Sequence, residues 1–172
     1  QKRRRLPAVG AGELTLAFAQ LEVGARYDLA HIGARAAKEA DGGYVLGGEK
    51  RVVVHGEGAD LLVVSARTAG EIADAKGVSV FLVDPKARGI ALGGYRTIDG
   101  MRASDIAFDG VRVGADALIG KVHRALEKAA GDTSKSLYDR NRAVYEMLRY
   151  GVKVRPDVGE TLARRIVESR QA

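Results

Sequence analysis

The chain has 172 residues, 46% of them hydrophobic but only 5% aromatic, so a core must be built from Val, Leu, Ile and Ala. It contains no Cys, which excludes disulfides, thiolate metal sites and Cys nucleophiles and is consistent with a cytoplasmic protein. The net charge is +6, carried mostly by the two ends, and no apolar run is long enough for a membrane span.

The basic opening, QKRRRLPAVG, has no apolar segment after it, so it is interpreted as the inside of a longer chain rather than a signal peptide. Residues 1–120 then hold 19 of the 22 Gly, and short Val, Leu and Ile runs alternate with Gly and Asp. This pattern is typical of antiparallel β structure.

The apolar runs predict six or seven strands at the spacing of a small barrel or sandwich. The GGEK segment at residues 47–50 is expected to form a hairpin turn, because its glycines allow positive φ. A polar loop is expected at 69–77, and Asp84-Pro85 should end the strand before it. The expected strands are 14–21, 44–46, 51–54, 59–68, 78–85, 89–98 and 104–113.

From Lys121 onward the apolar spacing becomes helical, which predicts helices at 121–131, 136–151 and 161–172. This part holds 12 of the 28 Lys and Arg but 7 of the 22 Asp and Glu. We therefore expect a β-domain at 1–120 and a basic helical tail at 121–172. A basic tail can bind nucleic acid, although a solvated helix face is the commoner role.

No self-contained catalytic constellation is found in the residues. His31, His55 and His123 lie far apart in the sequence, so no metal site is predicted. Neither a G-x-S-x-G elbow nor a G-x-G-x-x-G turn between strand and helix occurs. Glu22 and Asp28 could pair as general acid and base, but two exposed acids in a β-connection are the simpler interpretation.

Four segments of the sequence carry a family resemblance when they are taken in order. They are QKRRRLPAVGAGELTLAFAQLEVGARYD, DGGYVLGGEKRVVVHGEGADLLVVSART, GVSVFLVDPKARGIAL and MRASDIAFDGVRVGADALIG. Together they resemble the middle β-domain of acyl-CoA dehydrogenases, over residues 1–120. The resemblance implies a mainly β fold, a small antiparallel barrel or sandwich, to which the sequence adds two or three C-terminal helices.

That family oxidises acyl-CoA thioesters to the enoyl form, with FAD as hydride acceptor and a Glu base. The resemblance implies one segment that runs along the edge of the flavin ring and a second segment that forms a wall of the flavin site. It also implies a substrate contact beside them. The helical domains that carry the base are missing, so no catalytic residue is assigned and activity would need those domains or a partner subunit. The implied residues are Phe18, Gln20, Leu21 and Glu22 at the edge, Val52, Val53 and Val54 at the wall, and Arg26 and Tyr27 near acyl-CoA.

Several of these residues depart from the family pattern. Leu21 stands where the family has Thr, Tyr27 where it has Ser, Val52 where it has Trp and Val54 where it has Ser or Thr. Each hydrogen bond lost could cost ~1–3 kcal/mol, while backbone amides could still hold the ring. The pattern is most similar to the small-subunit type of pimeloyl-CoA dehydrogenase, which implies that flavin binding rests with a partner subunit.

Residues 136–160 resemble the start of the R subunit of type I restriction enzymes. Two interpretations stay open for the tail, a composite or excised chain and an unusual helical tail packed on the barrel. For function, the first hypothesis is an FAD- and acyl-CoA-binding domain that is inactive alone. The alternatives are a nucleic-acid-binding module and a β-barrel interaction scaffold without flavin.

Overall fold

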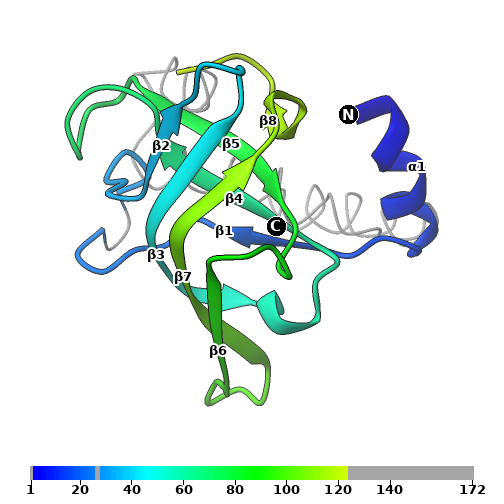
Figure 1. Cartoon of the computed structure of the whole chain (residues 1–172). Coiled ribbons are helices and arrows are strands. Elements are labelled where there is room, and N and C mark those ends of the chain that lie inside the picture. The colour runs from blue at the N-terminus through cyan, green and yellow to red at the C-terminus, as the bar shows by residue number, and fades with distance from the viewer. Residues whose placement is uncertain (1, 26–27, 124–172) are drawn as a thin grey trace, which may run out of the picture.

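The computed structural model describes residues 2–25 and 28–123, and the fold below is that of these residues. They form a mainly β structure with one helix beside the sheet, as Figure 1 shows, which confirms the β class. The helix is α1 (Lys2–Ala11), and short 3₁₀ turns follow β3 and β7. The strands are β1 (Leu16–Ala19), β2 (Arg35–Lys38), β3 (Tyr44–Val54), β4 (Leu61–Arg67), β5 (Val78–Val83), β6 (Ile90–Arg96), β7 (Arg102–Val113) and β8 (Leu118–Ile119).

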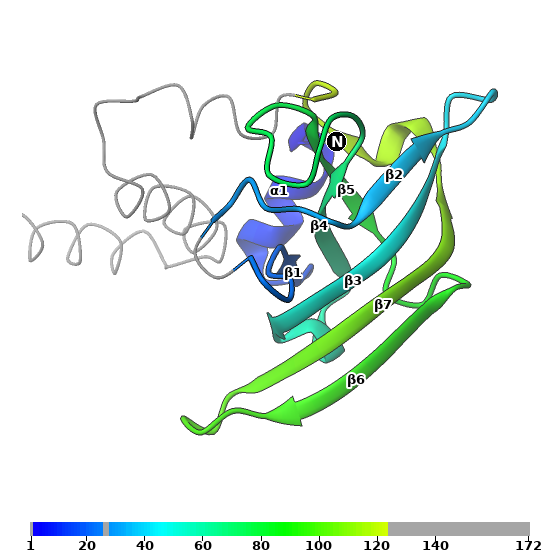
Figure 2. The same cartoon turned by 90° about the vertical axis from the view of Figure 1, so that its left-hand side faces the viewer.

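The described strands form one continuous sheet in the order β6-β7-β3-β2-β4-β5-β8, with β1 beside β4. Figure 2 shows β3, β7 and β6 running side by side, with β1, β4 and β5 behind them. Most neighbours are antiparallel, as predicted, but β1 and β2 each pair with β4 in parallel. The sheet therefore folds over into two layers that enclose a core.

The core is formed by the side chains that face inward from both layers. The rings of Tyr44 on β3 and Phe81 on β5 meet across it, with centroids 4.9 Å apart in a tilted arrangement. Aliphatic side chains and the ring of Phe108 fill the remaining space. The larger members are Leu46, Val53, Leu62, Val64, Val83, Ile106, Phe108 and Val111.

Strands β4 to β7 confirm the predicted apolar runs to within a few residues, and β5 ends just before Asp84. The hairpin predicted at GGEK is wrong, because residues 44–54 form one uninterrupted strand. Gly48 is needed there for close approach: a Cβ on it would lie 2.7 Å from Ala34 Cα. The actual turn lies one step earlier, where Gly42 N–H donates to Glu39 O.

Apart from the two-residue strand β8, two of the described helices and strands were not predicted. The first, α1, ends in a Schellman motif, in which Gly12 N–H donates to Val9 O, Glu13 N–H donates to Ala8 O, and Gly12 has φ 76°. The second, β2, buries only Ala36 and so lacks the alternation that marks a strand.

The predicted C-terminal helices and the stretch that resembles a restriction-enzyme subunit fall almost wholly on residues 124–172, outside the described residues. Only the start of the helix predicted at 121–131 can be compared. Residues 121–123 form a bend and a turn there, and His123 has φ 63°.

Candidate functional site

The end of β1 and the end of β3 lie side by side. Arg51 N–H donates a hydrogen bond of 2.8 Å to Leu21 O, which joins the segment after β1 to β3. The structure thus brings together residues 18–22 and 52–54, the two segments predicted as flavin edge and second wall. Arg26 and Tyr27 lie outside the described residues.

The predicted residues differ in what they present at this junction. Val52 and Val54 are 44% and 38% exposed, unusually high for valines in a strand. Val53 and Gln20 are buried, so they can offer a ligand little beyond backbone. Phe18, Leu21 and Glu22 are half-buried. The accessible side-chain surface of the wall is therefore apolar.

A β-bulge in β3 exposes the two valines. Lys50 pairs with Ile106 and Val53 with Ser104, so three steps on β3 match two on β7. Val52 is the extra residue and has φ 51°, a strained conformation for a β-branched side chain. The bulge turns Val53 into the core and leaves Val52 and Val54 facing outward.

Asp105 on β7 holds the bulge in place. Its Oδ1 accepts the Val52 N–H at 3.1 Å and the Tyr95 hydroxyl at 3.0 Å, and its Oδ2 accepts Arg51 Nη1 at 2.7 Å. Partial burial acts to raise the pKa of Asp105, but these donors together hold it below its usual value. The N–H that the bulge displaces from the ladder is thereby satisfied.

Replacing Val52 by Asn should stabilise the protein by about 1 kcal/mol, because Asn tolerates the left-handed region that strains Val. For a chain of this size the melting temperature should rise by roughly 3–4 °C, measured by circular dichroism. Val54→Asn is the control, since residue 54 does not have positive φ, and it should lower stability slightly. Equal effects of both changes would contradict strain at Val52.

Behind the wall, Lys50 is completely buried. Its Nζ donates to Glu22 Oε1 at 2.6 Å, Ser65 Oγ at 3.0 Å and Gln20 O at 3.3 Å. Burial lowers the pKa of Lys50 to about 8, an effect only partly offset by the charge and hydrogen bond of Glu22. The interpretation of Glu22 as an exposed acid is wrong, since its side chain is 8% exposed and ion-paired.

The lowered pKa predicts how stability depends on pH. Between pH 8 and 10.5 the unfolded chain binds the Lys50 proton more tightly than the native protein does. The free energy of unfolding should therefore rise with pH relative to Lys50→Met, by up to ~1.4 kcal/mol per pH unit. Urea titrations of both proteins from pH 7 to 10 measure this gap. A difference that stays constant from pH 7 to 10 would show that the ion pair, and not burial, dominates, because the native pKa would then not lie below 10.5.

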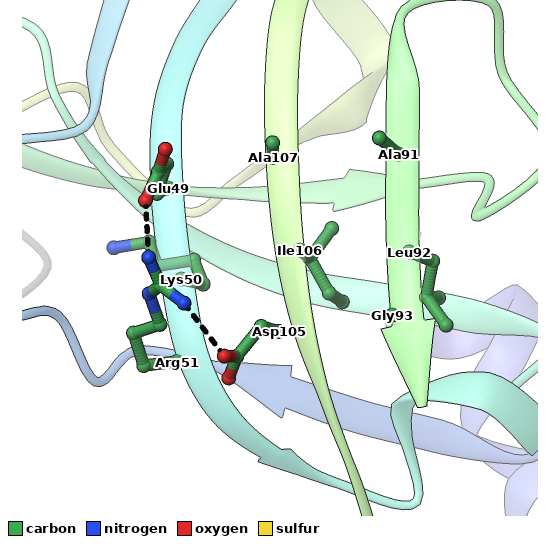
Figure 3. A pocket seen from close by; sticks show the side chains of 9 residues that line it. All are labelled: Glu49, Lys50, Arg51, Ala91, Leu92, Gly93, Asp105, Ile106 and Ala107. Carbon is green, nitrogen blue, oxygen red and sulfur yellow. Dashed lines mark hydrogen bonds and ion pairs between the residues drawn. The ribbon is translucent and has the colours of Figure 1, made fainter. Parts of the chain in front are cut away.

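A groove of about 380 Å³ crosses β3, β7 and β6 beside the bulge. In Figure 3 Arg51 lies between Glu49 and Asp105, with which it forms ion pairs of 2.9 and 2.7 Å. These charges largely satisfy one another, so the groove has no strong preference for an anion or a cation. No pattern in the sequence predicted this groove. It is lined by Glu49, Lys50, Arg51, Ala91, Leu92, Gly93, Asp105, Ile106 and Ala107.

The described ranges lack two further kinds of feature. Across residues 2–25 and 28–123, no three His, Asp or Glu side chains gather in a way that could hold a metal ion. Within the same ranges, no helix combines the length and apolarity that a membrane crossing requires.

Known proteins resemble this arrangement in both sequence and fold. The family model "Acyl-CoA dehydrogenase, middle domain" matches residues 17–111. The acyl-CoA dehydrogenase FadE29 of Mycobacterium tuberculosis is 33% identical over 122 residues, which are 70% of this chain and 31% of FadE29. The chain belongs to the acyl-CoA dehydrogenase family, whose middle domain it contains.

Solved structures agree with this family. In the ChsE4-ChsE5 complex from Mycobacterium tuberculosis, one chain is 28% identical with a TM-score of 0.70, covering 78% of this chain and 34% of its own length. A structure described as an FAD-dependent dehydrogenase is 25% identical with a TM-score of 0.66, covering 81% of this chain and 36% of its own. The chain spans less than half the length of these relatives.

Proposed function

We propose that residues 1–120 act as the FAD- and acyl-CoA-binding middle domain of an acyl-CoA dehydrogenase. The observation that carries this proposal is the junction of residues 20–22 with residues 52–54 through the Leu21–Arg51 hydrogen bond. Membership of the family and similarity to a protein described as an FAD-dependent dehydrogenase support the choice of cofactor.

The residues at the junction fit one face of a flat heteroaromatic ring. Val52 and Val54 offer an apolar surface for the ring, while Leu21 provides no hydroxyl for its polar edge. Polar contacts would therefore come from the backbone of residues 20–22 and 54, whose groups do not depend on side-chain type. When bound, FAD supplies the hydride acceptor for α,β-oxidation of an acyl-CoA thioester.

No residue of this chain is assigned as the base that removes the α-proton. We propose that helical domains of the family, or a partner subunit, provide this base, so that the chain alone is inactive. The similarity to a subunit of the ChsE4-ChsE5 complex supports a partner. Arg26 and Tyr27 are proposed to contact acyl-CoA or the flavin phosphate.

Titration of the full chain with FAD, followed by quenching of flavin fluorescence, tests the cofactor. Replacing Val52 and Val54 by Glu puts charge against the ring face and should weaken binding at least about tenfold. Leu6→Glu is the control, since Leu6 is an exposed apolar residue on α1. Absence of binding at ~100 µM FAD, alone or with a candidate partner subunit, would overturn the cofactor proposal and favour the scaffold without flavin.

A further inference from the structure

Glu22 holds together the two ends of the loop that leads from β1 to β2. These two ends, residues 20–22 and 33–34, form the neck of the loop. Its Oε2 accepts the Gly33 N–H at 2.5 Å and its Oε1 accepts the Ala34 N–H at 3.0 Å. One carboxylate therefore joins the two ends of the segment 22–34. Because it accepts both backbone donors, the carboxylate holds residue 22 against residues 33 and 34.

Lys50 fixes this neck to the sheet. All three of its ammonium hydrogens have acceptors: the Gln20 carbonyl at the start of the neck, the Glu22 carboxylate and Ser65 Oγ on β4. The side chain projects from β3, two positions before Val52. Besides the hydrogen bond from Arg51 N–H to Leu21 O, one buried cation therefore fixes the position of residues 20–22 relative to the valine wall.

The returning half of the loop has a separate anchor. Arg67 Nε donates to Ile32 O at 3.0 Å and Nη2 to Ala30 O at 2.6 Å. Ile32 N–H in turn donates to Ile72 O at 2.9 Å. Loss of the neck should therefore loosen the loop locally without releasing the whole segment from the protein.

We propose that Glu22 and Lys50 are positioning residues, whose ion pair holds the backbone of residues 20–22 against the wall of residues 52–54. This role rests on the proposed flavin site. The pair orders the loop before any cofactor binds, so that binding does not have to order it. Neither side chain needs to touch the cofactor for this purpose.

Glu22→Gln is the sharpest test of the pair. Lys50 Nζ, Gly33 N–H and Ala34 N–H all donate to Glu22, whereas Gln has one acceptor oxygen and adds two donors. At least one donor must then lose its partner. Glu39→Gln is the matched control, because Glu39 pairs with the largely exposed Arg112 at 3.1 Å on the surface.

Hydrogen exchange of the full chain, without flavin, should be followed by mass spectrometry in both variants. Amides of residues 23–34 should exchange about tenfold faster in Glu22→Gln than in wild type, with β4 and β5 changed less than about twofold. Glu39→Gln should leave the loop unchanged. Ser65→Ala removes one acceptor of Lys50, and a few-fold rise in loop exchange from it decides the question if Glu22→Gln does not fold.

Unchanged loop exchange in a folded Glu22→Gln protein overturns the proposal, and so does equal acceleration in the loop and the core strands. FAD titration of the same proteins then separates this proposal from the proposed function. A dissociation constant about tenfold higher in Glu22→Gln, and unchanged in Glu39→Gln, supports both. Faster loop exchange in Glu22→Gln, together with a wild-type protein that binds no FAD, supports the positioning role of Glu22 and Lys50 and overturns the proposed flavin site.

Discussion

Replacing Lys50 by Met should lower the free energy of unfolding by about 3–5 kcal/mol, the usual result of removing one partner of a buried ion pair. Met fills a similar volume, but Glu22 keeps its charge at 8% exposure with only the backbone donors of residues 33 and 34. Ser65 Oγ and Gln20 O lose a donor as well. Urea unfolding followed by circular dichroism measures the loss.

The double variant Glu22→Gln with Lys50→Met separates the free-energy cost of lost packing from the cost of leaving Glu22 charged without Lys50. Because the double change removes both charges, it should recover part of the stability lost in Lys50→Met, which defines a coupling energy. Arg112→Met is the surface control, since Arg112 is 75% exposed, and it should cost less than about 1 kcal/mol. A loss below about 1 kcal/mol for Lys50→Met would show that the pair does not stabilise the fold.

Replacing Arg67 by Met should be about as destabilising, at roughly 3–5 kcal/mol. Arg67 is buried, and its guanidinium donates hydrogen bonds to six backbone carbonyls of the described residues. Each carbonyl left without a donor in the interior carries a desolvation cost. The acceptors are the carbonyls of Ala30, Ile32, Ala69, Ile72, Asp74 and Lys76.

Arg67→Lys distinguishes charge from geometry. Lys keeps the charge but has three donors on one atom, so it cannot reach acceptors on both the loop before β2 and the loop before β5. It should lose about 2–3 kcal/mol and make the segment 69–77 more sensitive to limited proteolysis. Arg112→Lys is the matched control and should change little. An Arg67→Lys variant as stable as wild type would show that charge alone suffices.

Much of the sheet could be predicted from the sequence, because β4 to β7 are apolar runs with clear ends. Residues 44–54 were divided wrongly because a glycine pair is compatible with both a turn and a close backbone contact, and only the position of Ala34 decides between them. β2 was missed because a strand with one buried alanine has no periodicity to detect.

The candidate site could be predicted only in part. The family resemblance indicated residues 18–22 and 52–54, and the structure brings these two segments together. Lys50 was missed because the prediction places it in the GGEK turn, and a charged run such as Glu49 to Arg51 is usually solvated. The alternation from Tyr44 and Leu46 does point Lys50 inward, and this was the available signal. The bulge at Val52 was not predictable, because it reverses that alternation within one residue.

The bulge also has an evolutionary consequence. Since Val52 is surplus to the ladder, a gene that lost this one codon would still place Val53 inward and Val54 outward in a regular strand. Residue 52 can therefore be exchanged, or deleted, without any change to the inherited pattern of the hydrophobic interior. If the proposed flavin site holds, selection on ligand binding at residue 52 and selection on folding at residue 53 act on separate positions, so the wall can diversify while the domain keeps its architecture.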